Sequence, residues 1–63
     1  MKDAVKVYYV NWKGVGAIRN IIPKRLFFGS TEYHPEEQWL LEVFDCDKLE
    51  CRTFAMKDIR VWM

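Results

Sequence analysis

The chain has 63 residues and a formal net charge of +1, and 51% of its residues are hydrophobic and 16% aromatic. A chain of this length buries only ~60% of the surface that its unfolded form exposes, so we expect one small domain, residues 1–63, with a thin core. The aromatic content excludes a disordered chain. No apolar run reaches the ~20 residues of a membrane helix, and the start Met1-Lys2-Asp3 lacks the apolar segment of a signal peptide. We therefore expect a cytosolic protein, and the small size argues against an enzyme because a closed catalytic pocket needs more supporting structure.

Charge is distributed unevenly along the chain. Residues 1–31 contain six lysines and arginines and one acid, residues 32–50 contain seven acids and one lysine, and residues 51–63 contain three cations and one acid. This asymmetry predicts a dipolar surface unless the fold interleaves the segments. An ordinary mixed, solubilising surface is the alternative. The net charge is lower than that of a strongly basic nucleic-acid binder.

Five segments have the composition and spacing of β-strands. Residues 5–12 come first, rich in β-branched and aromatic side chains, and Lys13-Gly14-Val15-Gly16 follows, where two glycines permit the positive φ angles of a tight reversal. Pro23 interrupts the next apolar stretch, because proline cannot donate a ladder hydrogen bond, and it therefore separates a second strand from a third. The remaining strands are predicted at residues 17–22, 24–28, 38–45 and 51–55.

The segments between these strands complete the predicted fold. Residues 31–37 form a polar loop, residues 47–50 a reversal, and residues 56–59 one helical turn before a short terminal segment. A helix over residues 35–44 is the competing interpretation, because Pro35-Glu36-Glu37 resembles a helix start. Five short strands with no room for two packed sheets predict an all-β chain, a small five-stranded barrel with at most one short helical turn, whose closure leaves no exposed sheet edge.

Alternation along residues 38–45 predicts which side chains face the core. If Trp39, Leu41 and Val43 point inward, Glu42 points to solvent. The opposite parity would bury an unpaired carboxylate, which is costly, so we predict the first arrangement.

The same parity predicts an apolar outer surface. Leu40 and Phe44 would face outward, and Tyr8 and Trp12 would add to them from the first strand. A contiguous exposed apolar patch often marks a contact surface. A homodimer or a protein partner would cover this patch, or the terminal Val61-Trp62 segment of the chain would do so.

The cysteines and the histidine give no sign of catalysis. Cys46 and Cys51 flank a reversal and could face each other across a hairpin, but two reduced thiols are the more common state in a cytosolic protein. Their spacing, with His34 as a distant third ligand, matches no zinc pattern. No catalytic triad order or phosphate-binding glycine loop is recognised either. We therefore expect no metal, no cofactor and a solvated His34.

Two arginines have a pattern that points to phosphate binding. Arg19 and Arg52 each lie two residues before a large apolar residue in a predicted strand, so the guanidinium and the apolar side chain share a face. Such an arginine can bind phosphate with its fork of donors and stack on a base or ring. An ion pair with Glu42 or Glu50 at a barrel rim is the structural alternative.

Four segments of the chain follow one another in the order and spacing of a known family. They are Arg19-Asn20-Ile21-Ile22-Pro23, Leu26-Phe27-Phe28, Trp39-Leu40-Leu41-Glu42-Val43, and Arg52-Thr53-Phe54-Ala55-Met56 with Ile59. Together they resemble the WYL domain family, named for a Trp-Tyr-Leu triplet, over roughly residues 5 to 59. The resemblance implies an Sm-like (Src-homology-3-like) small β-barrel. It also implies the setting of bacterial transcription regulators, where the domain lies beside a DNA-binding domain and senses a ligand, in several cases a nucleotide or nucleic acid, through a basic pocket.

The resemblance carries over to individual positions, with departures. Arg19 and Arg52 match arginines of the family pattern, Trp39 and Leu41 match the outer members of the triplet, and Pro23 and Phe54 match framework positions. Leu40 replaces the central tyrosine, and Asp58 stands where the family often has arginine. No DNA-binding domain accompanies the barrel in this sequence. The departures imply a diverged bacterial or phage accessory protein whose ligand sensing is altered or lost.

The sequence therefore predicts one of two non-enzymatic functions. The first is a module that recognises a nucleotide or single-stranded nucleic acid, with phosphate contacts from Arg19, Arg52, Lys24, Arg25 and Lys57 and stacking by Phe27. The alternative is a protein-interaction or assembly module whose contact patch is formed by Tyr8, Trp12, Leu40 and Phe44. Neither function involves a membrane or a metal.

Overall fold

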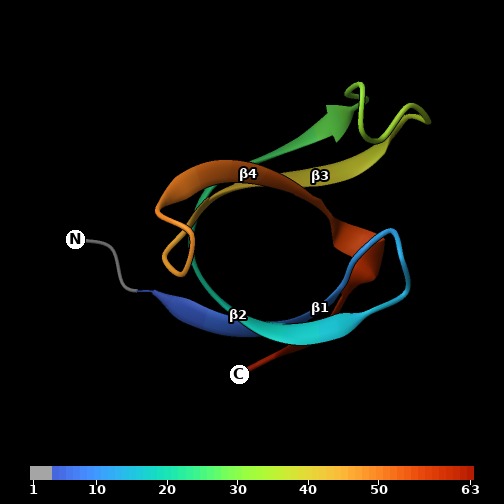
Figure 1. Ribbon diagram of the computed structural model, residues 1–63. Coiled ribbons are helices and arrows are strands. Elements are labelled where there is room, and N and C mark those ends of the chain that lie inside the picture. The colour runs from blue at the N-terminus through green and yellow to red at the C-terminus, as the bar shows by residue number, and fades with distance from the viewer. Residues whose placement is uncertain (1–3) are drawn as a thin grey trace.

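The computed structural model describes residues 4–63, which form one antiparallel sheet of five strands. The strands are β1 (Val5–Val10), β2 (Gly16–Gly29), β3 (Gln38–Asp45), β4 (Glu50–Ala55) and β5 (Ile59–Trp62), and a short 3-10 turn, η1 (Met56–Asp58), joins β4 to β5. Their order in the sheet is β4-β3-β2-β1-β5. The sheet curls round on itself (Figure 1), but it is not closed, because no ladder joins β4 to β5 within the described residues. The prediction of a mainly β chain is confirmed, whereas the closed barrel is not.

The N-terminal residues 1–3 lie outside the described part of the chain. The expected absence of a signal peptide, and the charges counted for Lys2 and Asp3, fall on these residues. Among residues 4–63, no helix has the length and apolar character that crossing a membrane requires.

The segment predicted as two strands is a single long strand. Residues 17–22 and 24–28 both belong to β2, and the register of β2 on β3 shifts between Pro23 and Arg25. Such a shift is a β-bulge, which tolerates a proline that cannot donate to the ladder and bends the strand. The bend allows β2 to pair with β1 through its first half and with β3 through its second half.

The remaining elements follow the prediction closely, with two differences. Residues 38–45 are the strand β3, so the helix interpretation is wrong, and η1 supplies the expected helical turn. The terminal segment is the strand β5, paired with β1. The first strand ends at Val10, because the Asn11 Oδ1 atom accepts hydrogen bonds from the N–H groups of Lys13 (2.9 Å) and Val15 (3.0 Å) and so starts the turn.

The two glycines of this turn serve different purposes. Gly14 has φ +81°, the left-handed conformation that the tight reversal requires. Gly16 has no positive φ; instead, a Cβ atom at this position would overlap the ring and hydroxyl of Tyr8. Gly16 therefore makes room for the Tyr8 side chain on the outer face of the sheet.

The core lies on the concave face of the curled sheet. It consists of Val7, Tyr9, Ile21, Leu41, Val43, Phe54 and Ile59. The rings of Tyr9 and Phe54 stack with their centroids 3.9 Å apart and join β1 to β4 across the interior. Leu41 and Val43 point inward as alternation predicts.

Two neighbours in β3 contradict the predicted alternation of buried and exposed residues. Trp39 is 54% exposed, because the ladder between β3 and β4 ends at Leu40 and Trp39 has a partner only in Phe28 of β2. Leu40 is fully buried, because it lies between Phe27 and Ala55 in a row of apolar side chains on the other face. The predictions of a buried Trp39 and an exposed Leu40 are therefore both wrong.

Candidate functional site

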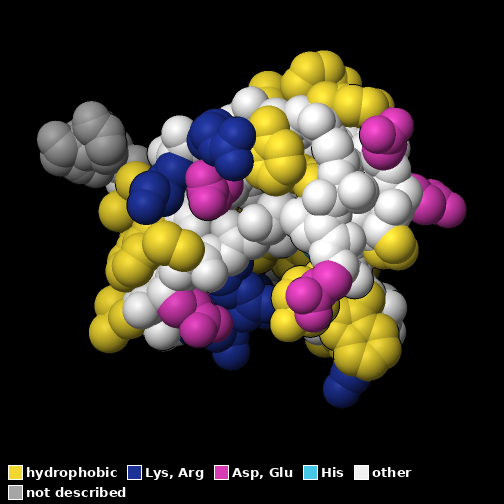
Figure 2. Space-filling view, turned by 90° about the horizontal axis from the view of Figure 1, so that it is seen from above, with side chains coloured by type: hydrophobic (Ala, Val, Ile, Leu, Met, Phe, Trp, Pro, Cys, Tyr) yellow, Lys and Arg dark blue, Asp and Glu magenta, His cyan; other side chains and the backbone are white. Residues whose placement is uncertain are grey.

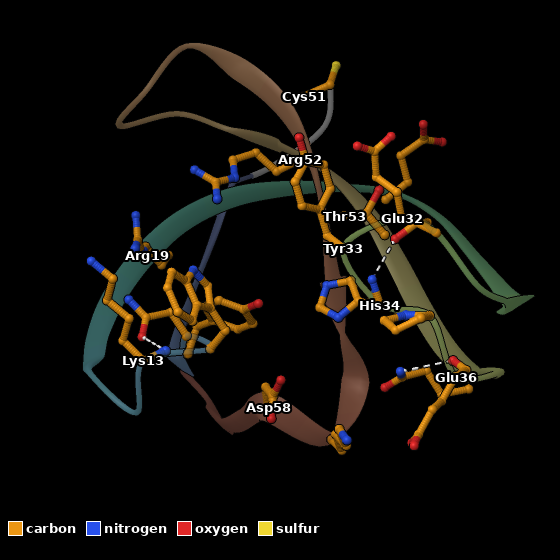
Figure 3. Close-up of a pocket in the computed structure, with 18 of the residues that line it drawn as sticks. Lys13, Arg19, Glu32, Tyr33, His34, Glu36, Cys51, Arg52, Thr53 and Asp58 are labelled. Atoms are coloured by element: carbon orange, nitrogen blue, oxygen red, sulfur yellow. Dashed lines mark hydrogen bonds between the residues drawn. The ribbon is translucent and has the colours of Figure 1, made fainter.

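An open groove of about 1520 Å³ is lined by both arginines that the sequence analysis selected. Arg19 comes from β2 and lies opposite Val7, and Arg52 comes from β4 and lies opposite Val43. Residues that oppose each other in a ladder share a face, so both guanidinium groups leave the concave face of the sheet. Figure 3 shows them at the same end of the groove.

Arg19 is held in place by a buried carboxylate. Its Nη1 atom lies 3.8 Å from Oδ2 of Asp45, which is fully buried, while the Arg19 side chain is 20% exposed. The other oxygen of Asp45, Oδ1, accepts the backbone N–H groups of Asp47 (3.0 Å) and Lys48 (3.2 Å) and so closes the turn between β3 and β4. Among residues 4–63, the buried Nε of Arg19 has no hydrogen-bond partner. The Arg19 side chain is 20% exposed and lines the groove, so part of its guanidinium faces a ligand there.

Arg52 is held more loosely. Its Nη1 atom lies 3.6 Å from Oε2 of Glu50, and the two side chains are 38% and 57% exposed. This is one of the two rim glutamates that the sequence offered as alternative partners. An exposed pair of this kind contributes at most about 1 kcal/mol. A phosphate group can therefore replace Glu50 as the partner of Arg52 at little cost.

The Tyr9 hydroxyl lies in the field of the groove's charged groups. Burial raises its pKa above the usual value of 10.0, and the Asp58 carboxylate raises it further, while Arg52 and Arg19 act in the opposite direction. The hydroxyl is therefore protonated at neutral pH and can donate a hydrogen bond. The sequence gave no signal for this polar role of Tyr9.

The groove is polarised rather than uniformly basic. Lys13, Arg19 and Arg52 lie on one side of it, and Glu32 and Glu36 on the other (Figure 3). In total, five lysines and arginines and five acids line the groove. The uneven charge distribution along the sequence thus reappears across this groove, and an anion is favoured only at the arginine end.

Two exposed aromatic rings line the same groove. Trp12, in the turn after β1, is 87% exposed, and the Lys13 Nζ atom lies 5.2 Å from the centroid of its ring. Tyr33, in the loop before β3, is 84% exposed. That loop is tightened by hydrogen bonds from the His34 N–H to Thr31 Oγ1 (3.0 Å) and from the Thr31 N–H to the His34 carbonyl (2.9 Å). His34 is consequently a half-buried part of the groove wall rather than a solvated loop residue.

The other predicted ligand contacts separate into two groups. Lys57 lines the groove, whereas Lys24 and Arg25 do not. The Arg25 Nε atom lies 3.3 Å from Glu42 Oε1, and its guanidinium carbon lies 4.4 Å from the centroid of the Phe27 ring. Phe27 shares the outer face with the buried apolar row and does not line the groove. Lys24, Arg25 and Phe27 are therefore not among the groove-lining residues, whereas Arg19, Arg52 and Lys57 are.

The predicted apolar contact patch is not contiguous. Leu40 is buried and Phe44 half-buried, Tyr8 is 37% exposed on the outer face of β1, and Trp12 lines the groove instead. On the face that Figure 2 shows, hydrophobic side chains form several separate groups with charged side chains between them.

The cysteines form no disulfide. Cys46 and Cys51 are both free, and the register sets Cys51 opposite Phe44 rather than opposite Cys46. The Lys24 Nζ atom lies 3.7 Å from the Cys51 sulfur. Within residues 4–63 there is also no group of three or more His, Cys, Asp or Glu side chains arranged to hold a metal ion.

Comparison of the chain with protein-family models, with curated proteins and with solved structures gave no match.

A short hydrogen-bond network beside Arg19 leads to a pH prediction. The Asn20 backbone N–H donates to Asp47 Oδ2 (3.1 Å), and its side-chain amide donates to both carboxylate oxygens (3.1 and 3.3 Å). These bonds, the backbone one first, hold the pKa of Asp47 below its usual value of 3.8. A lowered folded-state pKa stabilises the fold above the unfolded pKa, and this contribution is lost as the pH falls through the folded one.

We therefore expect Asp47→Asn to flatten the acid side of the stability profile. Melting temperatures measured between about pH 2 and pH 6 would check this. Glu37→Gln, which removes the same charge from an exposed residue, is the control and should leave the slope unchanged. An Asp47→Asn profile parallel to that of the wild type would contradict the role given to this carboxylate.

Proposed function

We propose that the chain is a non-enzymatic binding module that holds a phosphate-bearing ligand, a nucleotide or single-stranded nucleic acid, in the concave groove. The observation that carries the proposal is that Arg19 and Arg52 lie at one end of a groove that the exposed rings of Trp12 and Tyr33 also line. Guanidinium groups bind phosphate through several donors at once, and exposed aromatic rings stack on bases.

The proposal includes the finer fold and family assignment. We propose an Sm-like small barrel of the WYL type, open between β4 and β5. The curl of the sheet around a shared core supports the barrel (Figure 1). The four sequence segments between Arg19 and Ile59, which follow one another in the order typical of WYL domains, support the family assignment.

Each side of the groove has its own part in binding. The phosphate binds between Arg19 and Arg52, where the solvent-facing part of the Arg19 guanidinium and the more exposed guanidinium of Arg52 donate to its oxygens. The protonated Tyr9 hydroxyl is a further donor near this point. Glu32 and Glu36 repel phosphate from the opposite side, so the acidic side orients the ligand in the groove.

Charge reversal at Arg52 tests the proposal. The loss of a charge-assisted hydrogen bond to phosphate is worth about 1.5–3 kcal/mol, so Arg52→Glu is expected to weaken binding of a fluorescent oligothymidylate by about 10- to 150-fold. Because phosphate contacts release counterions, wild-type affinity should fall steeply with salt, and the variant's slope should be smaller by about 0.7. Fluorescence anisotropy at several salt concentrations measures both quantities.

Lys6→Glu provides the matched control. Lys6 is an exposed lysine of β1 that does not line the groove, and its reversal changes the net charge as Arg52→Glu does. Affinity close to the wild-type value is expected. Equal losses in the two variants would mean that net charge alone attracts the oligonucleotide, and absence of wild-type binding at low salt would refute the proposed function.

A further inference from the structure

β5 is an edge strand with an apolar surface. It pairs with β1 on one side only, and no strand of the described chain pairs with its other side. Its last residues are exposed: Val61 to 48%, Trp62 to 48%, and the following Met63 to 60%. An edge of this kind, with unpaired backbone groups and apolar side chains, is a template for a further strand.

The backbone of β5 points in a defined direction at this edge. The Met63 N–H donates to the Lys6 carbonyl of β1 (2.9 Å). The backbone groups of successive strand residues point to opposite sides of the strand. Val61 is two residues before Met63, so its backbone groups also face β1, whereas the N–H and C=O of Trp62 face the free edge. The register between β1 and β5 skips Arg60, so Arg60 lies opposite no residue of β1.

A row of uncharged side chains leads across the outer face to this edge. Ile18 of β2, Tyr8 of β1 and Val61 of β5 lie opposite one another on adjacent strands, and they are 52%, 37% and 48% exposed. Opposed residues share a face, so the three side chains form one apolar row that ends at the free edge.

We propose that this edge binds a second copy of the chain, with the two β5 strands antiparallel about a two-fold axis at Val61. Pairing the same edge of two copies is isologous and closes the assembly as a dimer. Val61 then lies opposite the partner's Val61, and the two rows of apolar side chains join into one band across six strands.

The side chains and the backbone favour this register over its neighbour. An axis at Arg60 would set two guanidinium groups against each other, whereas an axis at Val61 sets Arg60 opposite the partner's Trp62, where a cation and an aromatic ring attract. The central pair of an antiparallel ladder can lack interchain hydrogen bonds, as required for Val61, whose backbone groups face β1. Trp62, with its outward N–H and C=O, supplies the interchain bonds.

The dimer is independent of the ligand groove. No residue of β5 lines the groove, so the groove remains open when two copies pair. One strand and one apolar row make a small interface, at the low end of the range for specific complexes. The net charge of +1 per chain causes little repulsion between copies. We therefore expect a concentration-dependent dimer.

Charge complementation at Val61 tests the proposal. In sedimentation velocity at rising concentration, the mass of the wild type should approach that of two 7.6 kDa chains. Val61→Lys and Val61→Glu, each alone, set like charges against each other at the axis and should weaken the dimer by at least about 10-fold. An equal mixture of the two variants should restore the dimer, because opposite charges then meet. Val15→Lys, in the turn between β1 and β2 and 59% exposed in the wild type, is the control and should dimerise as the wild type does.

Three results would overturn the proposal: a wild type of single-chain mass at every concentration, a Val61→Lys variant that dimerises as tightly as the wild type, or a mixture that stays monomeric. Circular dichroism checks that each variant is folded. Val61→Thr, which keeps the branched shape and the strand preference, serves if the charged variants unfold. It should weaken the dimer while its spectrum stays that of the wild type.

Discussion

Phe54→Ala is expected to lower the free energy of unfolding by about 3–5 kcal/mol, because it removes a large ring from the centre of the core. Phe54 is 1% exposed and stacks on Tyr9, so the ring joins β4 to β1 across the interior of the curled sheet. Total stabilities of small domains are about 5–15 kcal/mol. The variant should therefore unfold at much lower urea concentration, or be unfolded in buffer.

Two controls separate the loss of core packing from the loss of an aromatic ring in general. Phe54→Leu keeps most of the buried volume and should cost much less than the alanine variant. Phe28→Ala removes a ring that is 54% exposed and in edge contact with Trp39, outside the core. Equal losses for Phe54→Ala and Phe28→Ala would contradict a core centred on the stack between Phe54 and Tyr9.

Asp45→Ala is expected to lower the free energy of unfolding by about 2–4 kcal/mol. The substitution leaves two backbone N–H groups of the β3–β4 turn without their acceptor, and it leaves the largely buried Arg19 guanidinium without its carboxylate. In a domain of this size, each kcal/mol lowers the melting temperature by about 4–8 °C. Differential scanning fluorimetry can measure a shift of this size.

The two roles of Asp45 are separable by substitution. Asp45→Asn keeps an oxygen that can accept the turn N–H groups but removes the charge that Arg19 faces. We therefore expect it to lose less than half of what the alanine variant loses. An asparagine variant as unstable as the alanine variant would show that the charge, rather than the turn bonds, dominates at this position.

The sequence predicted an element well wherever local signals were sufficient. The strand β3 has the predicted bounds because turn residues flank a run of apolar side chains. The prediction that Pro23 separates two strands is wrong. A proline can end a strand or occupy a bulge within it, and only the pairing with β3 decides between the two. The prediction of a buried Trp39 is wrong, because the exposure of Trp39 depends on where the neighbouring strand β4 ends. Alternation within β3 does not encode the end of β4.

The candidate site, like the fold, was predictable only where it depends on local sequence patterns. Arg19 and Arg52 were found because each alternates with an apolar residue in a strand, which is a local pattern. Asp45 and Tyr9 were missed as site residues, because their roles depend on side chains that are distant in sequence. The acid at the end of an apolar strand, directly before a turn, is the one signal that could have indicated Asp45.

The most direct test of the groove as a phosphate-binding site is an NMR titration that follows the backbone amides and the arginine side-chain Nε–H signals as oligothymidylate is added. Our account predicts that the signals of Arg19 and Arg52 shift together with those of Tyr9, Trp12 and Tyr33, while the signals of Lys24 and Arg25 shift little. Signals that stay unchanged at low salt, or shifts centred on Lys24 and Arg25, would contradict it.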